Sequence, residues 1–178
     1  MIRVVQGELA QADTAAILRP VSAEWEPVTP ATRRLEIAAG KALIEQCEKL
    51  GDLPVGSAVI TSAGDLPAEF MVHVIVRSIE ERVSVPIIHR ALRNGLRRLS
   101  EYGIDSVAMP PIGTGAGNLD PEEVAFEMVP ILLEHLQSGE PPAQIDVMVD
   151  TSYEKDAFER ELKRYELPFL PGTEPQPK

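Results

Sequence analysis

The stretch that decides the fold is Val107-Ala-Met-Pro-Pro-Ile-Gly-Thr-Gly-Ala-Gly-Asn-Leu-Asp-Pro-Glu-Glu123. It predicts a short buried strand over residues 107–109, a glycine-punctuated loop over 111–120 and then a helix. Asp120 is suited to cap that helix, with Pro121 at its first position and Glu123 at its third. A strand that leads through a glycine-rich loop into a helix is typical of α/β proteins that bind phosphate.

The loop between strand and helix carries glycine at every second position, Gly113, Gly115 and Gly117. Glycine reaches unusual backbone angles easily and lets a ligand approach the main chain, so successive N–H groups can converge on an anion. Because the Asp120 carboxylate caps the helix and repels anions, the loop is the expected phosphate site rather than the helix tip. The alternative is a plain turn whose glycines serve geometry alone, since glycine-rich patterns arise often without a ligand.

Outward from this stretch, β-branched and apolar runs alternate with apolar residues at helical spacing. Strands are expected over residues 2–5, 15–18, 58–61, 70–76 and 145–149. Helices are expected over 30–50, ended by Gly51, from Pro86, from 121 to about 136, and over 153–165, while residues 20–30 are irregular. The alternation predicts a three-layer α/β/α arrangement in one domain over 1–166. Residues 167–178 form a proline-rich tail that is expected to fray.

Composition narrows the classes of function. The 178 residues are 44% hydrophobic and carry a net charge of −11. This charge argues against bulk nucleic-acid binding and against an anionic membrane surface, but not against a small nucleotide held by backbone amides. No run is long enough to span a membrane and no signal peptide is visible, so a cytoplasmic setting is expected. Cys47 fits a packed core position, and His73, His89 and His135 are scattered, so no metal and no cofactor are predicted.

Four segments in order resemble the macrodomain family, a module that binds ADP-ribose. These segments are Val5-Gln-Gly-Glu8, Leu53 to His73, Ala91 to Pro111, and Ile112-Gly-Thr-Gly-Ala-Gly-Asn-Leu119, and the likeness extends over residues 2–165. The resemblance implies a mixed central sheet. It also implies recognition of ADP-ribose or a related adenine nucleotide, free or attached to protein or nucleic acid. Some members hydrolyse the ADP-ribosyl bond or an ADP-ribose 1″-phosphate.

The resemblance also assigns roles by position. Glu8 is expected to accept a hydrogen bond from the adenine amino group, and Asp150 or Tyr153 to border the base. Tyr153 has an equally weighted alternative as an ordinary packing residue. The diphosphate is expected to lie against the loop, whose candidate binding residues are Gly113, Thr114, Gly115, Ala116, Gly117, Asn118 and Leu119.

The departures from the family pattern fall where the second ribose would bind. Active members end the second strand in Asn-Ala-Ala-Asn and follow it with a glycine-rich loop, whereas this chain reads Arg19-Pro-Val-Ser22 and has no glycine between Glu8 and Gly40. Ser22, in place of the last asparagine, is the remaining candidate contact for a ribose hydroxyl. Trp25, in the irregular segment, either covers a pocket or fills the edge of the core.

Three functions therefore stay open. The first is a binding module for ADP-ribose or a related nucleotide with a divergent distal-ribose site. The second is an ADP-ribosyl hydrolase or ADP-ribose 1″-phosphate phosphatase, with no catalytic residue identified. The third is a macrodomain fold that binds no nucleotide and serves as an interaction or assembly surface; the oligomeric state is not predicted.

Overall fold

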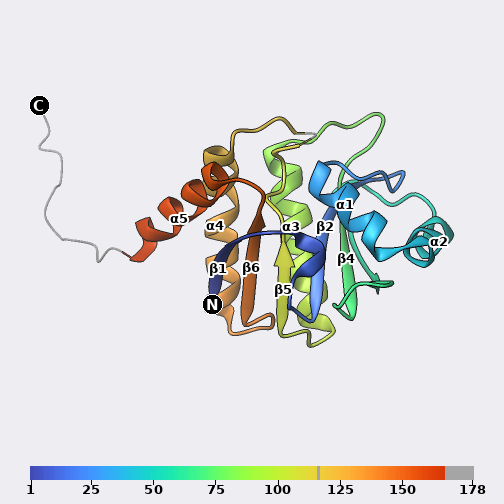
Figure 1. Cartoon of the computed structure of the whole chain (residues 1–178). Coiled ribbons are helices and arrows are strands. Elements are labelled where there is room, and N and C mark those ends of the chain that lie inside the picture. The colour runs from blue at the N-terminus through green and yellow to red at the C-terminus, as the bar shows by residue number, and fades with distance from the viewer. Residues whose placement is uncertain (116, 167–178) are drawn as a thin grey trace, which may run out of the picture.

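In the computed structural model, residues 1–115 and 117–166 are described, and they form a six-stranded sheet with helices on both faces (Figure 1). The strands are β1 (Ile2–Gln6), β2 (Ala16–Ser22), β3 (Ala58–Ser62), β4 (Phe70–Arg77), β5 (Ser106–Met109) and β6 (Gln144–Val149). The helices are α1 (Pro30–Ala39), α2 (Lys41–Leu50), α3 (Val85–Glu101), α4 (Pro121–Ser138) and α5 (Ser152–Glu166), with a short 3-10 helix η1 (Leu9–Gln11) after β1.

The sheet has the strand order β1-β6-β5-β2-β4-β3. Every neighbouring pair is parallel except β3 and β4, which run antiparallel from Ala58 opposite Val74 to Ser62 opposite Phe70. The predicted mixed sheet is therefore confirmed. Four of the parallel strands, β1, β6, β5 and β2, place their carboxyl ends at one edge, where ligands bind in open α/β sheets.

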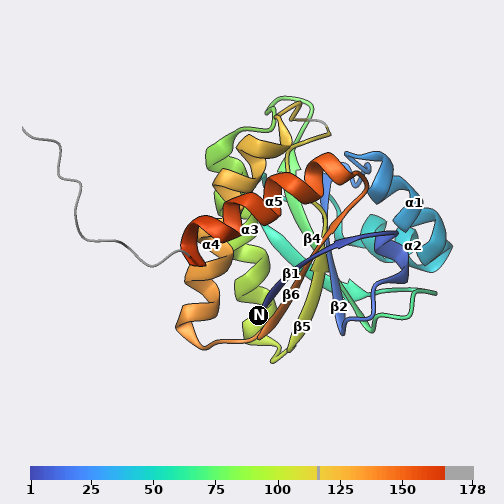
Figure 2. The same cartoon turned by 60° about the vertical axis from the view of Figure 1, so that its left-hand side comes forward.

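The helices form two layers on either side of this sheet, as Figure 2 shows with α3 and α4 on one side and α1 and α2 on the other. Buried side chains of α3, α4 and α5 pack with β4, β5 and β6 in one cluster, which includes Leu92, Leu96, Met128 and Phe158. A second cluster joins α1, α2 and η1 to the opposite face through Leu35, Leu43 and Met71. The three-layer α/β/α prediction is confirmed.

Two local features differ from the predictions. The helix expected over 30–50 is two helices, because Gly40 adopts a φ of 81° where a Cβ would collide with the Asp65 side chain. The second strand is longer than expected and runs through Pro20 to Ser22. A proline is tolerated there because β5 pairs only with Ala16 and Ile17, so that side of β2 is unpaired beyond them.

This early divergence of β2 from β5 leaves a gap at the carboxyl edge of the sheet that loops must fill. No helix within the described ranges is long and apolar enough to cross a membrane. The tail predicted over 167–178 lies outside the described residues.

Candidate functional site

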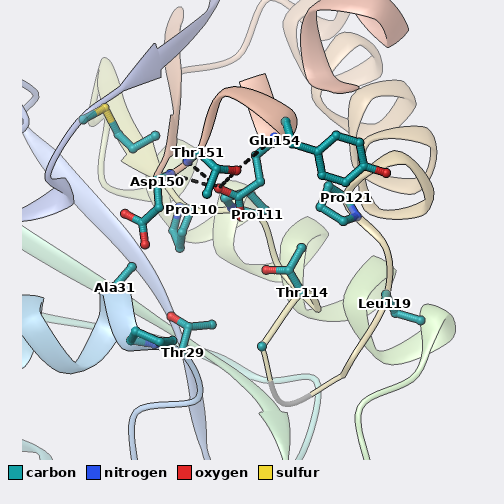
Figure 3. A pocket seen from close by; sticks show the side chains of 14 residues that line it. Thr29, Ala31, Pro110, Pro111, Thr114, Leu119, Pro121, Asp150, Thr151 and Glu154 are labelled. Carbon is teal, nitrogen blue, oxygen red and sulfur yellow. Dashed lines mark hydrogen bonds between the residues drawn. The ribbon is translucent and has the colours of Figure 1, made fainter. Parts of the chain in front are cut away.

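A cavity of about 380 Å³ lies at the carboxyl edge, between the loops that follow β2, β5 and β6 (Figure 3). Its volume is within the range of small-ligand pockets. The residues that line it come from these loops and from the starts of α1, α4 and α5: Thr29, Pro30, Ala31, Pro110, Pro111, Thr114, Gly115, Leu119, Pro121, Met148, Asp150, Thr151, Tyr153 and Glu154.

The loop after β5 is a tight turn that only glycine can form at two positions. Gly113 has a φ of 115°, and a Cβ on Gly117 would lie 2.5 Å from the Gly113 carbonyl oxygen. Main-chain hydrogen bonds from Asn118 to the Gly115 carbonyl (3.0 Å) and from Leu119 to the Gly113 carbonyl (3.1 Å) close the turn. Asn118 also has a positive φ, of 50°, which asparagine tolerates better than most residues.

Two residues of this loop line the cavity and have amides without a partner among the described residues. Thr114 and Gly115 line the cavity, and no acceptor for their N–H groups is found among residues 1–115 and 117–166. Leu119 also lines the cavity. Gly113, Gly117 and Asn118 shape the turn but do not line the cavity. Ala116 lies outside the described residues. The structure therefore separates the predicted loop residues into those that line the cavity and those that hold the turn.

The start of α1 forms the wall opposite this loop. Thr29 caps the helix: its Oγ1 accepts from the Thr32 amide at 3.1 Å, while its own amide donates to Thr32 Oγ1 at 3.0 Å. Pro30 follows and has no N–H, so Ala31 supplies the first amide of this wall that has no acceptor within the described part of the chain. Figure 3 shows Thr29 and Ala31 beside the loop that carries Thr114.

The loop after β6 forms a carboxylate-rich side of the cavity. Glu154 Oε2 accepts from the amides of Asp150 and Thr151, each at 3.0 Å, and the Thr151 hydroxyl accepts from the Glu154 amide at 3.2 Å. This is a capping box, which satisfies the amides of Thr151 and Glu154 and places the Glu154 carboxylate at the start of α5, where it disfavours a phosphate. The spacing Thr151-x-x-Glu154 after a strand was the sequence signal for it.

Arg34 of α1 bridges two of the predicted binding residues. Its Nε donates to Glu8 Oε2 at 3.0 Å and its Nη2 to Asp150 Oδ1 at 2.8 Å. Hydrogen bonds to Asp150 first, and to Glu8, raise the pKa of the Arg34 guanidinium. Glu8 and Asp150 are thus brought together, although only Asp150 lines the cavity. Nothing local marked Arg34, which is one of several charged residues on an exposed helix face.

Tyr153 lies at the rim and is held by the cap of α4. Its hydroxyl donates to Asp120 Oδ1 at 2.9 Å and to Oδ2 at 3.2 Å, while Asp120 Oδ1 also accepts from the Glu122 amide at 2.9 Å. The hydrogen bond to Asp120 raises the pKa of Tyr153 above its ordinary value. The two loops that carry these residues are tied together across one end of the cavity. The predicted contact of Tyr153 with a base stays a prediction.

Ser22 lies apart from the cavity. It is fully buried, and its Oγ accepts from the amides of Glu24 at 3.2 Å and Glu26 at 3.1 Å. The Ser22 amide donates to the Glu26 carbonyl at 3.0 Å, so the chain folds back on itself directly after β2. The structure gives this hydroxyl a role in the turn, and the predicted contact with a ribose is not tested.

Trp25 does not line this cavity; it packs at the edge of the core and borders a second cavity, of about 190 Å³. Its indole N–H donates to the Gly51 carbonyl at 2.9 Å, and its ring meets His73 edge-on with centroids 5.3 Å apart. Behind His73 lies Arg19, fully buried between the sheet and α1–α2, whose Nε donates to His73 Nδ1 at 2.9 Å. Arg19 therefore points to the face opposite the cluster of α3 and α4.

Within the described ranges, no group of three or more His, Cys, Asp or Glu residues is arranged to hold a metal ion. The cavity offers instead two kinds of groups: amides of the β5 loop and the α1 start that have no acceptor within the described residues, and the carboxylate of Asp150. Amides attract phosphate oxygens, and a carboxylate accepts from the amino or hydroxyl groups of a nucleoside.

Comparison with known proteins agrees with this geometry. The model of the family described as Macro domain matches residues 31–128. An uncharacterized protein of Aeropyrum pernix is 36% identical over 129 residues, which cover 71% of this chain and 68% of that protein. An O-acetyl-ADP-ribose deacetylase of Escherichia coli K12 is 35% identical over 120 residues, which cover 64% of this chain and 68% of the enzyme.

Solved structures give the same result for the fold. A mutant of the Oceanobacillus iheyensis macrodomain with ADPR has a TM-score of 0.84 at 20% identity, with 93% of each chain covered. The same macrodomain with ADP also has a TM-score of 0.84, covering 93% of this chain and 91% of that chain. The family model matches more than half of this chain, and a relative is more than 30% identical to it. The chain therefore belongs to the macro domain family.

Proposed function

We propose that this protein binds ADP-ribose or a related adenine nucleotide in the cavity at the carboxyl edge of the sheet. The observation that carries the proposal is the set of cavity amides from Thr114, Gly115 and Ala31, which have no acceptor within the described residues. These three residues are partly exposed, so their amides are accessible to a ligand, and a phosphate oxygen is a suitable acceptor for them.

The net charge of −11 does not oppose this proposal. A phosphate held by main-chain dipoles in a partly enclosed site interacts with nearby groups more strongly than with distant surface charges, which salt screens. Arg34 also neutralises two carboxylates beside the cavity, Glu8 and Asp150. A structural neighbour supports the ligand class, since the Oceanobacillus iheyensis macrodomain, which has the same fold, is solved with ADP and, as a mutant, with ADPR.

Direct calorimetric titration of the purified protein with ADP-ribose, ADP, AMP and ribose 5-phosphate tests the proposal. At least one of the three adenine nucleotides, ADP-ribose, ADP and AMP, is expected to give a saturable binding signal. Thr114→Pro removes one of the loop amides and is expected to weaken binding at least about tenfold, which corresponds to about 1.4 kcal/mol. Arg97→Gln on the distant surface of α3 serves as the control, and the melting temperatures of both variants show whether they are folded.

The absence of binding by every nucleotide at millimolar concentration would refute the proposal and favour an assembly role, which light scattering measures. The deacetylase relative makes enzymatic turnover a separate question. Release of acetate from O-acetyl-ADP-ribose, or of ADP-ribose from a modified protein, measures it directly. We do not propose turnover, because the Ser22 hydroxyl, the candidate at the distal site, is buried and already accepts two amides.

A further inference from the structure

We propose that the cavity takes adenine nucleotides that end at their phosphates, such as AMP and ADP, and excludes the second ribose of ADP-ribose. This inference rests on the proposed function and narrows its ligand class. It follows from a contact between the β5 loop and the residues that precede α1. The hydrogen bonds that cap α1 and the contacts that hold the segment from Ser22 to Val28 keep this contact in place.

The contact lies between the β5 loop and the residues that precede α1. A Cβ added to Gly115 would lie 2.5 Å from Thr29 Cγ2 and 2.5 Å from the Val28 carbonyl oxygen. Both distances are shorter than a carbon atom can approach without displacing its neighbour. The two loops therefore leave no room for one methyl group between them, and a ribose ring is several times larger.

Thr29 is fixed in this position by its own helix. Its hydroxyl and amide exchange hydrogen bonds with Thr32, and its carbonyl accepts from the Arg33 amide at 3.0 Å. Thr32 is fully buried, so the cap is anchored in the core. Moving Thr29 away from Gly115 would break the hydrogen bonds of the first turn of α1. The contact is therefore held by the helix cap and forms a fixed wall of the cavity.

The segment from Ser22 to Val28, which leads into this wall, is held by contacts of its own. Ser22 is buried, Pro27 forms a bridge with Val21, and Trp25 is held by the Gly51 carbonyl. No residue from 19 to 28 lines the cavity. A ligand that follows the loop amides therefore meets the contact between Thr29 and Gly115, and the segment before Thr29 lines a different cavity, of about 190 Å³, on the side of Arg19 and Cys47.

The two carboxylates of this segment already have partners in the fold. Glu24 accepts from the Ile79 amide at 3.3 Å, and Glu26 pairs with Arg77 at 3.4 Å. These contacts tie the carboxylates to the end of β4 and hold the segment in place. A terminal phosphate, by contrast, needs no space beyond the cavity, whose lining includes Thr114, Gly115 and Ala31.

The test compares dissociation constants of AMP, ADP and ADP-ribose by calorimetry on the full chain. ADP is expected to bind at least about tenfold more tightly than ADP-ribose, because the second ribose gains no contact and must displace the wall. Equal or tighter binding of ADP-ribose overturns the inference and leaves the proposed function standing. Absence of binding by all three nucleotides overturns both.

A variant assigns the preference to the wall. Thr29→Ser removes the methyl group that faces Gly115 and keeps the hydroxyl that caps α1. It is expected to reduce the ratio of the two dissociation constants by about threefold or more, through tighter ADP-ribose binding. Thr14→Ser makes the same change at the opposite end of β2 and is expected to leave the ratio as in the wild type. An unchanged ratio in Thr29→Ser overturns the assignment.

Discussion

Removal of the Glu36 carboxylate is expected to destabilise the protein far more than the removal of an ordinary helix carboxylate. Glu36 of α1 accepts from Arg19 Nη1 at 2.7 Å. The Arg19 side chain is 1% exposed and that of Glu36 is 20% exposed. The other contacts of the guanidinium are neutral: His73 Nδ1 at 2.9 Å and Cys47 Sγ at 3.8 Å. Within the described residues, Glu36 is thus the carboxylate that compensates this buried charge.

The magnitude follows from this burial. Breaking a buried ion pair from one side costs roughly 3–5 kcal/mol, because the remaining charge is left without compensation. Since Glu36 keeps contact with solvent, we expect the lower end, about 3 kcal/mol for Glu36→Ala. For a chain of this length that loss lowers the melting temperature by about 6–12 °C. Arg19→Met removes the buried charge itself, so the double variant is expected to be more stable than Glu36→Ala alone.

Urea unfolding measures these free energies, with Trp25 as the fluorescent probe because it is the single tryptophan and packs against His73. Glu45→Ala is the matched control, since Glu45 lies on α2 in an exposed pair with Lys41 at 3.3 Å and is expected to cost at most about 0.5 kcal/mol. If Glu36→Ala loses less than about 1 kcal/mol, or no more than the control, the buried charge is compensated in another way and the reasoning is wrong.

Three further predictions concern pH, charge and the loop. Burial first, and then the neighbouring Arg19, hold the pKa of His73 well below 6.5. Below about pH 6.5 the unfolded chain therefore binds a proton at His73 that the native state does not bind, and the free energy of unfolding falls as the pH is lowered. Urea midpoints measured from pH 7 to 5 test this, and His73→Gln is expected to flatten the dependence of the midpoint on pH. Arg34→Gln is expected to cost at most about 1 kcal/mol of stability, because its pairs are exposed, yet to weaken ADP binding about threefold at low salt. Gly117→Ala is expected to lose about 2 kcal/mol, because its Cβ meets the main-chain oxygen of Gly113.

Each of these has a result that contradicts it. For His73, a variant that keeps the full pH slope assigns the titration to another group. For Arg34, a loss of affinity that is equally large at about 0.5 M salt excludes a screened charge effect. For the loop, Gly7→Ala is the control, because its Cβ would lie 3.8 Å from Met148 Cε in ordinary contact. Equal stability of the Gly7 and Gly117 variants shows that the turn can relax.

Most of the architecture was readable from the sequence because its signals are local. A β-branched run such as Phe70 to Val76 gives a buried strand, and a cap such as Asp120-Pro121 gives the start of a helix, wherever the chain places them. The glycine loop after Met109 was predicted for the same reason. Gly40 was one missed boundary: its φ is 81°, and Asp65, a residue from a distant loop, occupies the place that a Cβ would take there.

The site depended on contacts between segments that are far apart in the chain. The sequence by itself determined the family, the layer order and the position of the glycine-rich loop, because these are carried by short patterns. Only the tertiary structure decided that Arg34 joins Glu8 to Asp150, that Ser22 turns inward, and that Thr29 rests on Gly115. These depend on how β2 diverges from β5 and on where α1 then begins, and neither is encoded by neighbouring residues alone.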